Sequence, residues 1–154
     1  QIATLIVKPK EWIIGVFNKK KGIFTNKTMR QAVQAALSMK PIMTNAVGRP
    51  EFYRVDPAIL FKETVWWSDA GKELYDQGNA EKAKRLMREA GYKGETIRWM
   101  CTKEYEWMYQ SAVIGAQQLK EVGFNVDLQV MDWASVVQRR TNPMPTRYSR
   151  REWA

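Results

Sequence analysis

The stretch "GAQQLKEVGFNVDLQVMDWASVV", residues 115–137, decides the fold. Its first part continues an apolar helical stripe that stops at Gly123, a residue type that commonly ends helices in the left-handed conformation. Residues 126–130 then alternate between apolar and polar side chains, which is the pattern of a half-buried strand. Asp132 follows this strand and can cap a further helix whose inward face carries Val136 and Val137. The stretch therefore predicts helix, strand and helix in succession.

The residues before this stretch complete a crossover unit. Residues 95–101 alternate, with Ile97, Trp99 and Cys101 on one side. The helix between the two strands, along residues 108–122, makes a connection that is typical of parallel pairing. Such units are right-handed in nearly all known cases. The sequence therefore predicts an α/β fold that contains a β-α-β crossover with flanking helices.

Three further helices are indicated by apolar spacing and by end signals. Residues 29–37 follow a helical spacing that Asn26 can cap, and Pro41 suits the first turn of a second helix to about Val47. A clear third helix follows Asn79 and stops at Gly91. A shorter helix is expected over about residues 69–77.

The other regions give weaker signals. Apolar runs at Thr4–Val7 and Trp12–Phe17 predict two strands. Residues 48–68 fit no period, and they hold several aromatic residues, Trp66 and Trp67 among them. Because flexible linkers are poor in aromatic residues, we interpret this stretch as an extended, partly buried connection.

The amino-acid composition limits the kinds of chemistry that the chain can perform. The 154 residues suit one domain with a real core, and 45% hydrophobic with 27% charged residues is typical of a globular chain. The sequence has no histidine, and Cys101 is its only cysteine. The commonest metal ligand, the commonest general base and any thiolate cluster are therefore missing, so no metal and no cofactor is predicted. No apolar run is long enough to cross a bilayer, and the start at Gln1 leaves the compartment open.

The formal net charge of +9 has two interpretations. Clusters of basic residues lie at residues 19–30 and 139–151. They are either solvated loop and tail charges or the footprint of a small basic nucleic-acid-binding domain. "GYKG", residues 91–94, has the GxxG shape of an RNA-clamping loop, but a strand pattern follows it. A helix stop and a tight turn explain those glycines better.

Catalytic patterns find no support in the sequence. Ser111 and Ser135 have no histidine to activate them, and neither a GxSxG elbow nor a phosphate-binding glycine loop occurs. The carboxylates are scattered without a spacing that indicates an acid–base pair. We therefore predict no catalytic residue and no enzyme activity.

Candidate ligand-binding residues follow the two strands of the crossover. Ligands of parallel α/β sheets collect beyond the carboxyl ends of the strands. The candidates at those ends offer a charge, a hydroxyl, an acid and aromatic faces: Lys103, Tyr105, Trp107, Asp132 and Trp133. For Asp132 a simple helix cap is the favoured interpretation, because capping alone explains an acid at this position, whereas the aromatic residues can equally be core. The seven tryptophans and six tyrosines suit recognition of a peptide or a sugar, because such rings offer broad contact area with few rotamers to freeze.

Three motifs in order resemble a known family. They are "GVFNKKKGIFTNKTMRQAVQAALSMKPIMTNAV" (15–47), "NAEKAKRLMREAGYKGETIRWMCT" (79–102) and "QQLKEVGFNVDLQVMDWASVVQRR" (117–140). The chain resembles the extracellular solute-binding proteins of family 5, which are peptide, oligopeptide and nickel receptors of bacterial ABC importers. The resemblance covers roughly residues 12–141.

The resemblance implies a periplasmic-binding-protein-like fold of type II, cluster C. It implies that residues 1–142 are the C-terminal lobe of a two-lobed receptor without its N-terminal lobe, and that 143–154 are a divergent basic tail. The implied ligand is a peptide or another small solute, and the implied partner is an ABC permease. The implied location is periplasmic or membrane-anchored extracellular, in a bacterium. A lone lobe is expected to bind its ligand weakly and to expose apolar surface that favours self-association.

The loop after residues 95–101 departs from some relatives. Peptide-binding relatives can place an arginine there against the peptide carboxylate, whereas this chain has Lys103. Lysine supplies a charge but not a two-pronged fork of donors.

Overall fold

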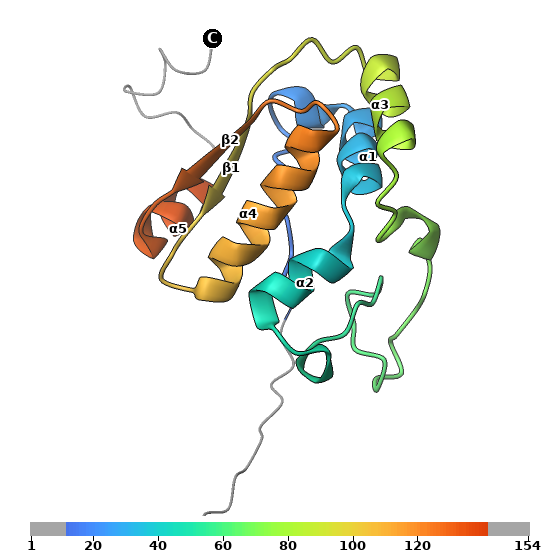
Figure 1. Cartoon of the computed structure of the whole chain (residues 1–154), viewed down its shortest axis with the longest axis vertical. Coiled ribbons are helices and arrows are strands. Elements are labelled where there is room, and N and C mark those ends of the chain that lie inside the picture. Colours follow the sequence, from blue (N-terminus) through green and yellow to red (C-terminus); the bar gives the residue numbers. More distant parts are fainter. Residues whose placement is uncertain (1–11, 142–154) are drawn as a thin grey trace, which may run out of the picture.

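The computed structural model describes residues 12–141, with side chains for 12–140. Its elements are α1 (Lys27–Ala36), α2 (Met39–Val47), α3 (Ala80–Glu89), β1 (Ile97–Cys101), α4 (Glu106–Glu121), β2 (Val126–Val130) and α5 (Trp133–Thr141), with single 3-10 turns at Ile23–Thr25, Pro50–Phe52 and Lys72–Leu74. Figure 1 shows α1 and α3 side by side at one end, the two strands and α5 at the other, and α4 between them.

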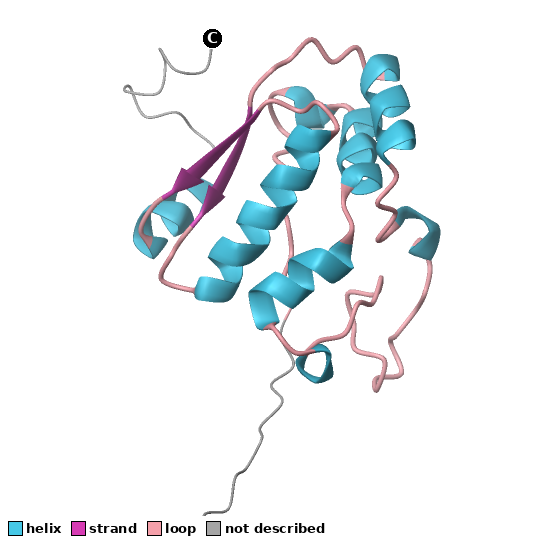
Figure 2. Ribbon diagram, in the orientation of Figure 1, coloured by secondary structure: helices cyan, strands magenta, loops and turns pink. Residues whose placement is uncertain are grey.

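The two strands confirm the predicted crossover. β1 and β2 pair in parallel, from Ile97 opposite Val126 to Cys101 opposite Val130, and the two magenta arrows of Figure 2 point the same way. Packing of the indole ring of Trp99 against Gly115 places α4 on one face of this sheet. α5 lies against the other face, and its residue Arg139 donates from Nη1 to Gln129 Oε1 at 3.0 Å.

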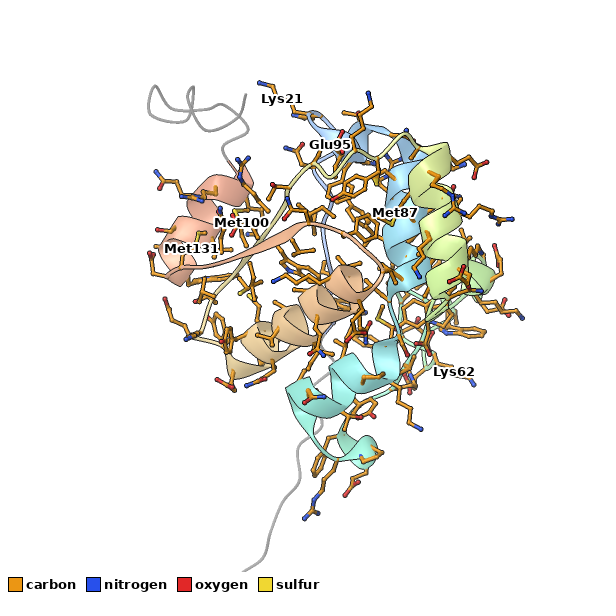
Figure 3. The ribbon with its side chains drawn as sticks, turned by 45° about the horizontal axis from the view of Figure 1, so that its top comes forward. Lys21, Lys62, Met87, Glu95, Met100 and Met131 are labelled. Atoms are coloured by element: carbon orange, nitrogen blue, oxygen red, sulfur yellow. The ribbon has the colours of Figure 1, made fainter. Side chains whose placement is uncertain are left out.

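The core forms where α1, α3, α4 and the sheet meet. Small side chains allow close approach of the helices, and Ala32, Ala35 and Ala83 are fully buried. Larger side chains fill the remaining space: Met29, Val33, Met87, Ile97, Leu119, Phe124 and Val126. Figure 3 shows Met87 on α3 near α1, whereas Met100 and Met131 lie where the strands meet α5. The apolar faces predicted from spacing are therefore mostly buried, whereas Val130 at the end of β2 is 42% exposed.

The predicted amino-terminal caps are confirmed. The Asn26 side chain accepts a hydrogen bond from Thr28 N at 2.8 Å, at the start of α1. The Asn79 side chain accepts one from Lys82 N at 2.9 Å, at the start of α3. Each bond satisfies one of the backbone donors that a helix start leaves without an intrahelical partner.

The two predicted glycine stops are Schellman motifs. Gly91 has φ +74° and Gly123 has φ +103°. Beyond them, Tyr92 N donates to Met87 O and Phe124 N donates to Leu119 O, both at 3.0 Å. The two rings that follow the glycines pack together, with centroids 5.4 Å apart. The apolar contact that usually accompanies this motif is thus shared between two helices.

The turns before the two strands are joined by polar groups. The Tyr92 hydroxyl donates to Glu95 O at 2.8 Å and accepts from Asn125 N at 2.9 Å. Asn125 Nδ2 donates to Gly94 O at 3.2 Å and to Thr96 Oγ1 at 3.0 Å. "GYKG" is therefore a helix-to-strand turn, as its strand context indicates.

Two predicted elements differ from the structure. Trp12–Phe17 is not a strand, because among residues 12–141 no other strand pairs with it. Ile14 and Val16 are consequently 73% and 76% exposed. The helix expected over 69–77 shrinks to the 3-10 turn Lys72–Leu74. The strand expected at Thr4–Val7 lies outside the described residues.

The connection over residues 48–68 is largely irregular and partly buried, as predicted. Trp67 donates from Nε1 to Asp56 Oδ1 at 3.2 Å, and the ring of Phe61 stacks on that of Trp12 with centroids 4.7 Å apart. Val65 and Trp66 are 91% and 74% exposed. Hydrogen bonds and ring stacking therefore fix one part of this connection, and the other part faces solvent.

Candidate ligand-binding site

The parallel register brings the two predicted loops to one edge of the sheet. β1 ends at Cys101 and β2 ends at Val130, and these two residues are opposite one another. Met131 N then donates to Cys101 O at 3.0 Å, so the two strands stay hydrogen-bonded for one residue beyond β2. Loop 102–105 and the start of α5 therefore lie next to one another at the carboxyl edge.

Three predicted residues meet there and form what we call the aromatic cluster: Tyr105, Trp107 and Trp133. The Tyr105 ring lies 6.0 Å from that of Trp107 and 5.3 Å from that of Trp133, which it meets edge to face at 89°. Tyr105 is 41% exposed, and both tryptophans are half-buried. The cluster thus combines rings that pack on one another with faces that are partly exposed to solvent.

Two cations flank the aromatic cluster. Lys103 Nζ lies 4.8 Å from the centroid of the Tyr109 ring, and Arg140 Cζ lies 5.9 Å from that of Trp133. Both distances are within the range of cation–π attraction. Sequence reasoning selected Lys103 but missed Arg140 and Tyr109. Helical spacing carries a signal for them, since Tyr109 is four residues after Tyr105 and Arg140 is seven after Trp133.

Asp132 caps α5, which is the simpler of its two sequence interpretations. Its carboxylate accepts from Ser135 N at 2.8 Å and from Ser135 Oγ at 2.7 Å. The hydrogen bonds from the Ser135 side chain and backbone lower the pKa of Asp132 below its ordinary value. A ligand contact by Asp132 stays a prediction.

Glu104 is a further residue at this edge that sequence reasoning missed. Its Oε1 accepts from Trp133 N at 2.7 Å, and its own N–H donates to Thr102 Oγ1 at 3.2 Å. Thr102 is fully buried. No pattern in the sequence signals the Glu104–Trp133 pair, because it depends on the register of two strands far apart along the chain.

Cys101 lies beneath this edge, and its thiol is unreactive. It is 1% exposed, and burial raises the pKa of its thiol, an effect that the nearby charge of Lys103 opposes only in part. The thiol therefore stays protonated at neutral pH, so it is a poor nucleophile and a poor metal ligand. Among residues 12–141, no three His, Cys, Asp or Glu side chains gather as a metal site would require.

Two other surfaces among residues 12–141 lie apart from this edge. A hollow on α3 is lined by Arg85, Leu86, Arg88 and Glu89, which all come from one helix. Trp66 and Trp67 belong to the 48–68 connection, which Figure 1 shows beside α2 and away from α5. In the part of the chain that is described, no helix is both long and apolar enough to cross a membrane.

A comparison against known families agrees with this fold. The model described as "Bacterial extracellular solute-binding proteins, family 5 Middle" matches residues 6–153. The chain belongs to this family. The crossover predicted from residues 95–130 is therefore part of a solute-receptor fold.

Individual relatives support the same assignment. The chain is 28% identical over 125 residues to "Probable peptide ABC transporter periplasmic-binding protein y4tO" of Sinorhizobium fredii, covering 77% of this chain and 22% of that protein. It is 27% identical over 141 residues to "Oligopeptide-binding protein AppA" of Bacillus subtilis, covering 82% and 25%. The crystal structure of the ABC transporter substrate-binding protein CtaP of Listeria monocytogenes superimposes with a TM-score of 0.72 at 27% identity, covering 80% and 25%.

These comparisons fix the fold and the general class. The chain has the α/β fold of type II periplasmic binding proteins and spans about a quarter of the length of these relatives. Family 5 consists of solute-binding proteins, which favours the receptor interpretation over a basic nucleic-acid-binding domain. The boundary expected at residue 142 lies at the limit of the described residues and stays a prediction.

Proposed function

We propose that this chain contributes one lobe of the solute receptor of a bacterial ABC importer, and that it binds peptides at the carboxyl edge of its sheet. The observation that carries the proposal is the aromatic cluster. Three residues selected from strand ends alone lie with their ring centroids 5.3–6.0 Å apart in successive pairs. Relatives named for peptide and oligopeptide binding support the ligand class.

The chemistry of the edge suits a short peptide. The open faces of Tyr105 and the two tryptophans can cover apolar side chains, and such rings lose little conformational freedom on binding. Lys103 and Arg140 place positive charge beside them. Asp132 and Glu104 already accept hydrogen bonds from α5, so their carboxylates are engaged by the protein. The edge therefore favours a ligand with apolar side chains and a carboxylate.

The proposal includes the partners of such a receptor. A second lobe would cover the ligand from the opposite side, and closure of the two lobes would present it to an ABC permease. The location in this proposal is periplasmic or membrane-anchored extracellular, in a bacterium. The chain itself performs no catalysis. Residues 1–142 form the receptor lobe in this proposal, and residues 143–154 form a divergent tail.

A titration followed by nuclear magnetic resonance tests the proposal. The probes are trialanine and Ala-Phe-Ala, added to the 154-residue chain up to about 10 mM, since a millimolar dissociation constant corresponds to about −4 kcal/mol. The indole N–H signals of Trp107 and Trp133 are expected to shift with both peptides and further with Ala-Phe-Ala. The Trp66 signal is the internal control and is expected to stay constant. Shifts confined to Trp66, or no shift at all, would refute peptide binding at this edge.

A further inference from the structure

We infer that Glu104 is a positioning residue that sets the place of Trp133 in the aromatic cluster. The inference rests on the proposed function only in that the carboxyl edge binds the ligand. Glu104 acts through the backbone of Trp133, whose N–H it accepts at 2.7 Å.

The hydrogen bond joins the two halves of the site. Trp133 is the first residue of α5, so its N–H has no partner within the helix. Glu104 belongs to the loop after β1, and Trp133 follows β2. The carboxylate therefore links the loop after β1 directly to the start of α5, in addition to the backbone bond from Met131 N to Cys101 O.

Glu104 is itself held in place. Its N–H donates to Oγ1 of Thr102, which is fully buried at the end of β1. A carboxylate acceptor makes the bond charge-assisted, and the amino end of a helix favours negative charge. The Thr102 hydroxyl and the Glu104 carboxylate thus connect the start of α5 to the end of β1.

The start of α5 has a second, independent cap. Asp132 accepts from Ser135 N and Oγ, which are different donors from the one that Glu104 serves. Removing the Glu104 carboxylate therefore leaves the helix capped. What changes is the freedom of the Trp133 backbone to move relative to Tyr105, whose ring meets the Trp133 ring edge to face at 5.3 Å. A binding constellation loses function when such placements drift by a fraction of an ångström.

Three variants separate positioning from general stability. Glu104→Ala removes the acceptor, whereas Glu104→Gln keeps an amide oxygen at the same place. Glu121→Ala is the matched control, because Glu121 is also an exposed glutamate that accepts a side-chain amide, Gln117 Nε2 at 3.0 Å, but lies at the far end of α4. All three variants are expected to melt within about 4 °C of the unchanged chain, since each loses at most one exposed hydrogen bond.

The first measurement uses the ligand-free chain. In Glu104→Ala, we expect the nuclear Overhauser signal between the Tyr105 and Trp133 rings to be lost and the amide signal of Trp133 to move from its position in the unchanged chain. In Glu104→Gln and Glu121→Ala, we expect both signals to stay as they are in the unchanged chain. Persistence of both signals in Glu104→Ala overturns the inference. So does their loss in Glu121→Ala, because the loosening would then be general.

The second measurement uses Ala-Phe-Ala as the probe. Glu104→Ala is expected to weaken its binding about tenfold, and Glu104→Gln less than threefold. An unchanged affinity in Glu104→Ala also overturns the inference. If the unchanged chain fails to bind the tripeptide, the proposed peptide function fails, and the ring contact in the ligand-free chain still decides the role of Glu104.

Discussion

Substitution of Gly115 by alanine tests the packing of α4 on the sheet. Gly115 lies in the middle of α4, where its missing side chain admits the indole of Trp99 from β1. A Cβ at this position would lie 2.5 Å from Trp99 Cη2 and 3.1 Å from Cζ3. The first distance is far inside van der Waals contact, so either the ring or the helix has to move.

The magnitude follows from two opposing terms. Alanine in a helix interior is favoured over glycine by about 1 kcal/mol. Overpacking of a fitted interface costs about 1–3 kcal/mol, and two close contacts with a rigid ring put this site near the upper end. We therefore expect Gly115→Ala to lower the free energy of unfolding by about 1–2 kcal/mol, equivalent to about 2–8 °C in melting temperature for a domain of this size.

Urea unfolding followed by circular dichroism measures this loss, and a double-mutant cycle identifies its cause. If the clash with the indole is responsible, Trp99→Phe shortens the ring and Gly115→Ala becomes neutral or stabilising in that background. Gly15→Ala is the control, because no atom lies within 4 Å of the added Cβ. Equal losses from Gly115→Ala with and without the indole would show that the reasoning from ring contact is wrong.

Three further predictions concern other parts of the chain. Tyr92→Phe removes the hydroxyl between the two strand-leading turns and is expected to cost about 1–2 kcal/mol in urea unfolding. Burial raises the pKa of Tyr92 above its ordinary value of 10.0. The stability that the hydroxyl contributes is therefore fully present below pH 10 and is lost as the pH rises through the pKa of the folded state. An unchanged stability difference between the Tyr92→Phe variant and the unchanged chain at high pH would contradict this prediction. Cys101 is expected to resist iodoacetamide at pH 8 in the folded chain and to react in urea, and rapid labelling of the folded chain would refute its burial. The double substitution Ile14→Lys with Val16→Lys is expected to reduce concentration-dependent association in sedimentation velocity, because both side chains are largely exposed on a segment that pairs with no described strand. Val65→Lys, at a still more exposed side chain, is the control and is expected to change the association less.

Local chemistry explains why most of the fold was predictable. Capping by Asn26 and Asn79, and the left-handed glycines at 91 and 123, act within a few residues of the elements they delimit. The strand alternation is equally local, and the length of the connection favours parallel pairing. Each of these features is therefore visible in one stretch of sequence.

Pairing over long distances explains what was wrong. Trp12–Phe17 has the composition of a strand, but a strand also needs neighbours for its N–H and C=O groups. Among the described residues the sheet consists of β1 and β2, and this segment belongs to neither. Composition reports the tendency to form a strand and carries no information about whether a partner is present.

The same distinction applies to the site. Tyr105, Trp107 and Trp133 were selected by a rule about strand ends, and the parallel register is sufficient to bring them together. Glu104 was missed because its role depends on which oxygen reaches which backbone N–H across two loops. Its neighbour Asp132 carries a recognisable local cap signal, which is why that role was available from sequence.

The open geometry of the aromatic cluster limits the affinity that this chain can reach alone. Covering the exposed faces of the three rings would bury on the order of 150 Å² of apolar surface, or about 4 kcal/mol. Loss of translational and rotational freedom on association costs at least about 4 kcal/mol, so little remains without a second wall around the ligand. One contact from Lys103 or Arg140 to a carboxylate adds about 1.5–3 kcal/mol, which corresponds to dissociation constants of millimolar or weaker. Calorimetry with trialanine and Ala-Phe-Ala is therefore expected to show no saturable heat at micromolar concentrations. Micromolar binding would mean that this surface encloses its ligand far more completely than three rings on one edge can.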